Sequence, residues 1–315
     1  MRHLVVLSSL LLAGGFSAMA SVDSGLLALV PSGAKIVGSL DVTQARHSEF
    51  GQYLLGKMQS EDGHFQEMIS ETGFDPRRDL QTILFEASGP GAASAGMSSS
   101  FAILARGNFD VARIKTLATS KGGATIVTYG GIDMLVTKDG SHQQKAVAFP
   151  ETGIAVMADL TTLKQMIDSR AAPSVLDPDL ISKINTVGAN NDAWFVSLVG
   201  GAFLADHAAA PQAKALQGVV QSSGGVKLGS TIQTTFDAVA RSPQDATSLS
   251  DVIRFMASMV QLQRQNNPQA NILAGALDSM TLETTGAAVH FAVALPEKSL
   301  EQIADMTPHS ASAPN

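Results

Sequence analysis

Short apolar runs joined by tight turns rich in glycine are the feature that most restricts the fold of this chain. Glycine accepts the positive φ that two-residue hairpin turns require. No strand–helix–strand unit with a glycine-rich turn repeats along the sequence. The sequence therefore predicts an α+β fold with mainly antiparallel strands, and not a doubly wound parallel sheet. The clearest predicted hairpins join 125–129 to 132–137 and 146–149 to 154–158.

Helix starts are marked by a capping residue followed by proline, as at Asp75-Pro76 and Ser242-Pro243. Proline suits the first helical position, and a capping oxygen accepts a hydrogen bond from an otherwise unpaired N–H group. Apolar residues at helical spacing predict the longest helix over 244–266. We also predict a helix over 211–222.

Two similar segments indicate that the chain consists of two related halves. Residues 151–168 and 284–305 each read as a turn, a strand and then a helix. We interpret this as a tandem duplication, with each half a hairpin-rich antiparallel sheet packed with helices. The alternative is that unrelated α+β domains often end in a hairpin and a helix. The predicted organisation is a signal peptide over 1–20, a first half over 21–172, a second half over 173–306 and a disordered tail over 307–315.

The N-terminus resembles an export signal. Basic Arg2 precedes an apolar run from Leu4 to Phe16, and Ala18-Met19-Ala20 has the small-x-small pattern of a cleavage site. A membrane-spanning helix needs about 20 apolar residues, and this run is shorter. We therefore predict cleavage after Ala20 and export to the periplasm or the extracellular space. No later segment reaches membrane-spanning length.

Composition excludes several classes of function. The chain has no cysteine, which excludes disulfides, thiolate nucleophiles, cysteine–metal sites and a lipid anchor on an N-terminal cysteine. Its formal net charge of −7 argues against nucleic-acid binding, which needs clustered basic residues. Hydrophobic residues make up 45% of the chain, enough for a packed core.

Catalytic motifs are missing from the sequence. It contains no H-E-x-x-H zinc motif, no Walker loop, no G-x-G-x-x-G fingerprint and no G-x-S-x-G elbow. We therefore predict no catalytic residue and no cofactor. The best metal candidate is the helical group His64, Glu67 and Glu71, although its side of the helix lies away from the apolar stripe and suits solvent better.

Five residues are candidate contacts for a ligand or a partner. A pair of arginines can hold an anion, although a pair at a helix start is usually a surface feature. A lone tryptophan can stack on a ligand, but it is more often part of the core. Methionines on an apolar helical stripe suit either a core or a binding groove. These candidates are Arg77, Arg78, Trp194, Met256 and Met259.

Four segments resemble a group of uncharacterised secreted bacterial proteins of acidobacterial type. They are GAKIVGSLDV (33–42), TGFDPRRDLQTIL (72–84), LARGNFDVARI (104–114) and the run over 237–263. The resemblance implies export and an α+β fold. It supplies no catalytic residues and no substrate.

Three functions are compatible with these observations. The first is a non-enzymatic binding or interaction protein of the cell envelope, whose partner is another protein or a second copy of this chain. The second is an exported hydrolase with a cleft between the halves, lined by His64, Glu67, Arg77 or Asp206. The third is a carrier of an apolar ligand, held by helix 244–266 against a long curved sheet.

Overall fold

The computed structural model describes residues 22–58, 63–88, 100–121, 123–137, 144–171, 175–201 and 210–306. The helices are α1 (Ser24–Leu27), α2 (Val42–His47), α3 (Glu49–Met58), α4 (Gly63–Thr72), α5 (Pro76–Asp79), α6 (Val111–Ser120), α7 (Leu160–Ala171), α8 (Pro178–Gly188), α10 (Ala210–Gln217), α11 (Pro243–Leu262), α12 (Pro268–Leu277) and α13 (Glu297–Met306). The strands are β1 (Ala34–Asp41), β2 (Leu80–Ser88), β3 (Ser100–Gly107), β4 (Ala124–Tyr129), β5 (Ile132–Thr137), β6 (Lys145–Glu151), β7 (Ile154–Asp159), β8 (Ala193–Ser197), β9 (Val219–Lys227), β10 (Thr231–Ala240), β11 (Thr281–Thr285) and β12 (Ala288–Pro296).

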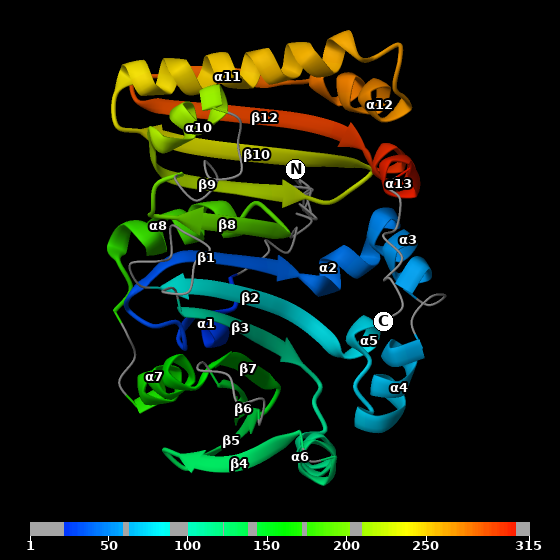
Figure 1. Ribbon diagram of the computed structural model, residues 1–315, viewed down its shortest axis with the longest axis vertical. Coiled ribbons are helices and arrows are strands. Elements are labelled where there is room, and N and C mark those ends of the chain that lie inside the picture. Colours follow the sequence, from blue (N-terminus) through cyan, green and yellow to red (C-terminus); the bar gives the residue numbers. More distant parts are fainter. Residues whose placement is uncertain are drawn as a thin grey trace, which may run out of the picture.

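The described strands form one twelve-stranded sheet in the order β11-β12-β10-β9-β8-β1-β2-β3-β7-β6-β5-β4 (Figure 1). Every pair of neighbouring strands is antiparallel. This confirms the predicted α+β class and its antiparallel strands. Both predicted hairpins are present, as β4–β5 and β6–β7.

The two predicted halves share this sheet and do not form one sheet each. The antiparallel pairing of β1 with β8 joins them. We call this β1–β8 pairing the seam. From the seam, the strand order is β1-β2-β3-β7 on one side and β8-β9-β10-β12 on the other. The sheet ends in β6-β5-β4 on the first side and in β11 on the second. The tandem duplication remains a prediction, and the predicted boundary at residue 172 lies outside the described residues.

A row of alternating phenylalanine and glycine residues crosses the seam on one face of the sheet. Phe236, Gly224, Phe195, Gly38 and Phe85 are direct neighbours on β10, β9, β8, β1 and β2. A phenyl ring lies where the side chain of each glycine would be: a Cβ atom on Gly38 would come within 2.2 Å of Cζ of Phe85. Glycine is therefore required at this position because an aromatic ring covers its backbone.

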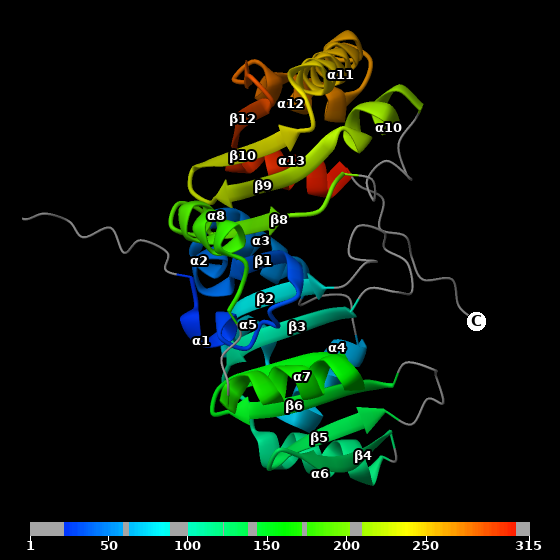
Figure 2. The same ribbon diagram turned by 90° about the vertical axis from the view of Figure 1, so that its left-hand side faces the viewer.

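The two faces of the sheet carry helices at different ends. On one face, α1, α7 and α8 cover the first half and the seam, and they bury Leu26, Leu163 and Leu180 completely. On the opposite face, α11 packs on β10, β11 and β12, and α10 packs on α11 and β9, around a smaller core that includes Ala238 and Leu249. Figure 2 shows α7 and α8 in front of the strands, and α11 with α12 at the far end of the sheet.

Local signals in the sequence located most helix starts correctly. Asp75 and Ser242 accept hydrogen bonds from N–H groups at the start of α5 and α11, with proline at the first helical positions. The prediction over 211–222 was partly wrong, since α10 ends at Gln217 and β9 begins at Val219. The long helix also ends earlier than predicted, at Leu262. No helix in the described ranges is long and apolar enough to cross a membrane.

Candidate functional site: an apolar cavity under helices α11 and α12

The predicted acidic cluster faces a lysine. Lys121 Nζ forms an ion pair with Glu71 and lies 3.9 Å from an oxygen of Glu67. The side chain of His64 lies outside the described residues. Within the part of the chain that the structure describes, no three histidine or acidic side chains are grouped to hold a metal ion. The carboxylates of this cluster therefore face a cation that belongs to the protein itself.

The arginine pair is engaged with its own helix cap. Arg77 Nη2 lies 2.8 Å from Oδ2 of Asp75, and Arg78 Nη2 lies 2.7 Å from Oδ2 of Asp79. These contacts hold the pKa of both carboxyls below the usual range, chiefly through the arginine side-chain hydrogen bonds. The arrangement fixes the turn into β2, so both guanidinium groups already have partners.

The other three candidates lie in different surroundings. Trp194 is 6% exposed and belongs to the core beneath α8. Met259 is 43% exposed on α11 and does not line the apolar cavity described below. Met256 does line it. Of the five candidate contacts predicted from the sequence, Met256 is the one that lines this cavity.

The floor of the cavity is made by cross-strand pairs on the face of the sheet that carries α11. Ile232 of β10 lies opposite Leu295 of β12, and Thr234 lies opposite Val293. Phe291 extends the floor toward the packed core under the start of α11. Because these residues alternate along their strands, their side chains point to one face. The floor is thus apolar apart from a single hydroxyl group.

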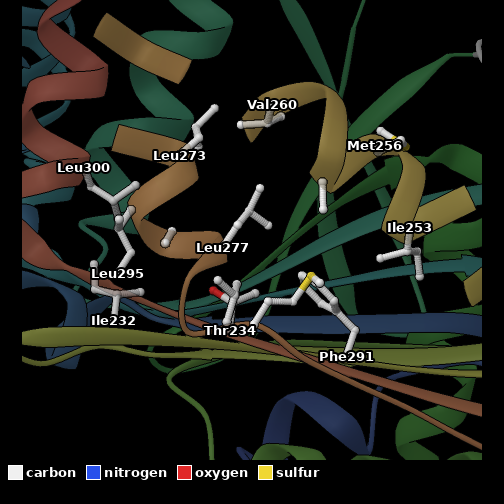
Figure 3. A pocket seen from close by; sticks show the side chains of 14 residues that line it. Ile232, Thr234, Ile253, Met256, Val260, Leu273, Leu277, Phe291, Leu295 and Leu300 are labelled. Atoms are coloured by element: carbon white, nitrogen blue, oxygen red, sulfur yellow. The ribbon is translucent and has the colours of Figure 1, made fainter. Parts of the chain in front are cut away.

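The roof is formed by α11 and α12, while Leu300 of α13 adds to the lining (Figure 3). The cavity has a volume of about 430 Å³, and among the described residues that line it Thr234 is the one with a polar side chain. The lining from the helices consists of Ile253, Met256, Ala257, Val260, Leu273, Ala276, Leu277 and Leu300, with Met280 after α12. Among the described residues this wall contains no ionisable group, and it is suited to binding by apolar contact.

Polar contacts outside the lining hold the roof in place. Gln261 Nε2 donates to the carbonyl oxygen of Ala274 at 3.1 Å, which ties α11 to α12. Ser279 Oγ donates to the carbonyl oxygen of Ala294 at 3.0 Å and accepts from its N–H at 2.9 Å, which ties the end of α12 to β12. At the other end of α11, Ser250 and Thr284 join their hydroxyl groups at 2.6 Å. The helices are thus fastened around the cavity without filling it.

The cavity is open to solvent beside two of its lining residues. Met256 is 53% exposed and Leu273 is 42% exposed, although both contact the cavity. Exposed apolar side chains at the edge of an apolar cavity provide a route by which a ligand can enter.

Sequence reasoning missed most of this lining. The alternation at Ile232, Val293 and Leu295 predicts strands, but it does not reveal that β10 and β12 are neighbours. The detectable signal was a long apolar helix followed at once by a second capped helix at Asn267-Pro268. That pattern indicates a helical hairpin, which can roof a sheet.

Comparisons with known proteins identify a related fold. Neither a family model nor a curated protein matches this chain. A crystal structure of TP0453, in its crystal form III, superposes with a TM-score of 0.51 at 11% sequence identity, covering 91% of this chain and 100% of that one. Crystal form IV of the same protein gives a TM-score of 0.49 at 12% identity, covering 90% and 97%. At this identity the likeness concerns the fold alone.

Proposed function

We propose that this protein is a non-enzymatic binding protein that holds a small apolar ligand, or the apolar chain of a larger one, between α11, α12 and the sheet. The observation that carries the proposal is the cavity of about 430 Å³ whose lining is apolar except for Thr234. Its volume lies within the range of small-molecule sites, roughly 300–1,000 Å³.

The geometry favours a small molecule over a partner helix. A helix is about 10 Å across with its side chains, whereas α12 already fills the space beside α11. The ligand is instead covered by side chains from three helices and two strands. Burying apolar surface contributes about 25 cal/mol per Å², so a flexible hydrocarbon chain is a suitable occupant.

Titration with 1-N-phenylnaphthylamine, an uncharged apolar dye, tests the proposal. We expect saturable binding with enhanced fluorescence, displaced by a long-chain fatty acid. Leu273→Gln places a polar group at the cavity opening and should weaken binding roughly tenfold, because about 1.4 kcal/mol of apolar contact is lost.

Leu262→Gln is the matched control. Leu262 is 75% exposed on α11 and does not line this cavity, so the same exchange should leave dye binding unchanged. Thermal unfolding of both variants establishes that they fold. Absence of saturable binding, or equal loss in the two variants, would contradict the proposal.

We further propose that the binding protein is exported, on the basis of the N-terminal pattern that ends at Ala20. The expected result is a mature chain that begins at Ser21. N-terminal sequencing of the protein recovered from its native host measures this directly. An intact Met1–Ala20 segment on that material would refute the proposed cleavage.

A further inference from the structure

A row of polar side chains crosses four strands on the face of the sheet opposite to α11. Ser223 of β9 lies beside Asp237 of β10, Asp237 beside His290 of β12, and His290 beside Glu283 of β11. Directly opposed residues of neighbouring strands project to the same face, about 5 Å apart. The register therefore places these four side chains in one line.

This row lies along a second cavity, separate from the apolar one. The cavity has a volume of about 460 Å³, and all four residues of the row line it. Its wall comes from α8, which contributes Lys183 and Thr186 among others. α8 packs on β8 and β9, whereas the side chains of His290 and Asp237 are 44% and 54% exposed, so the floor on β10 and β12 is open to solvent.

The row presents hydrogen-bond acceptors to this cavity. His290 Nδ1 lies 2.8 Å from Oδ1 of Asp237, and an ionised carboxylate only accepts, so the imidazole donates from Nδ1. In the neutral ring, Nε2 then carries the lone pair and is an acceptor. Glu283 adds a second carboxylate beside the ring, and within the described ranges it forms no ion pair.

Ser223 is a buried polar group at one end of the row. It is 6% exposed, lines the cavity, and its hydroxyl has no hydrogen-bond partner among the described residues. The hydroxyl is accessible from the cavity, where a bound molecule can hydrogen-bond to it. Ser223 therefore adds to the two carboxylates a polar group of its own that a ligand can contact.

We propose that this cavity binds a small organic cation with several N–H donors, either a guanidinium or a primary ammonium group. Such a group matches the carboxylates of Asp237 and Glu283, which both accept, and charge-assisted hydrogen bonds of this kind are the strong ones. The acceptors are spread along the row, and in the part of the chain described here they form no group that could hold a metal ion. The site does not depend on the apolar ligand, because the two cavities lie on opposite faces of the sheet.

The positive charge of Lys183 makes it possible to distinguish a cationic ligand from an anionic one. Of the described residues that line the cavity, it is the one lysine or arginine. A cation in the cavity is repelled by this ammonium group, whereas an anion would be attracted by it. Removing Lys183 therefore strengthens the binding of a cation and weakens the binding of an anion.

Isothermal titration of the whole chain with agmatine, which carries one guanidinium and one ammonium group, tests the site. Succinate serves as an anionic probe of similar length. We expect agmatine to bind and succinate not to bind. Glu283→Gln should weaken agmatine binding about tenfold, and Lys183→Met should strengthen it severalfold.

Asp251→Asn is the control for loss of one negative charge, since Asp251 is exposed on α11 and lies outside this cavity. It should leave agmatine binding unchanged. Amide chemical shifts of the variants show whether the strands keep their pairing. No binding of agmatine, or equal weakening by Glu283→Gln and Asp251→Asn, would overturn the proposal, as would preferred binding of succinate.

Discussion

Glu86→Gln is expected to stabilise the protein at alkaline pH, by about 3 kcal/mol at pH 8.5 but only by about 1 kcal/mol at pH 5.5. Glu86 of β2 is completely buried, on the face of the sheet that carries α1, α7 and α8. Burial, which disfavours the charged form, and to a lesser degree the carboxylate of Asp159 raise the pKa of Glu86 from 4.5 to about 7. Ser88 Oγ donates to Oε2 at 2.5 Å and partly opposes this shift.

The direction of the pH dependence follows from the two pKa values. Below pH 4.5 the carboxyl is protonated in both the folded and the unfolded chain, so it adds no penalty. Between pH 4.5 and pH 7 the unfolded chain releases the proton and the folded chain keeps it, so stability falls by about 1.4 kcal/mol per pH unit. Above pH 7 the penalty stays constant. Glutamine does not titrate and keeps an oxygen that can accept from Ser88.

Urea unfolding of the wild type and the variant at pH 5.5, 7 and 8.5 measures this difference. Glu283→Gln is the control, because Glu283 is exposed and its exchange also removes one carboxylate. The explanation fails if Glu86→Gln leaves the pH dependence as steep as in the wild type. Glu86 Oε1 has no hydrogen-bond partner in the described part of the chain, so a negative charge on this carboxyl is poorly stabilised.

Gly38→Ala is expected to destabilise the protein by about 3 kcal/mol, because it overfills the seam between the two halves of the sheet. The new Cβ atom would lie 2.2 Å from Cζ of Phe85 and 2.9 Å from the carbonyl oxygen of Trp194. The ring can rotate away only by giving up its packing, and the carbonyl belongs to the β1–β8 pairing. Both halves are affected since β1 joins them.

Thermal unfolding should show a fall in Tm of roughly 5–10 °C for Gly38→Ala. Gly33→Ala is the matched control, since no atom lies within 4 Å of a Cβ placed there. Combining Gly38→Ala with Phe85→Leu should cost less than the sum of the single changes, because both act on one contact. Strict additivity, or an equal loss in Gly33→Ala, would show that the clash is not the cause.

Local features were predictable because they depend on residues close together in sequence. The caps at Asp75 and Ser242 and the hairpin turn at Gly130-Gly131 all formed as expected. Each is a relation among a few consecutive residues, in which a side-chain oxygen meets a nearby N–H group or a glycine adopts a positive φ. The ends of α10 and α11 were less predictable because tertiary packing decides where a helix stops.

The candidate sites were only partly predictable. The sequence places Met256 and Met259 on one apolar helical stripe, and only the orientation of α11 on the sheet separates them. In the sequence, His290 lies between Val289 and Phe291 in an apolar strand, a position typical of a packed or edge-facing residue. Its neighbours Asp237 and Glu283 are far away in sequence or belong to another strand, so no local pattern could reveal the row.

By itself the sequence determined the α+β class, the hairpins, most helix starts and the lack of cysteine chemistry. The tertiary structure decided that one sheet serves both halves, that rings cover Gly38 and Gly224, and that β10 and β12 face α11 on one side and bear the polar row on the other. The physical reason is the separation along the sequence of the residues that interact. Turns and caps are set by bonds among adjacent residues, whereas cavities arise from the order and register of strands, which only packing across the whole chain can select.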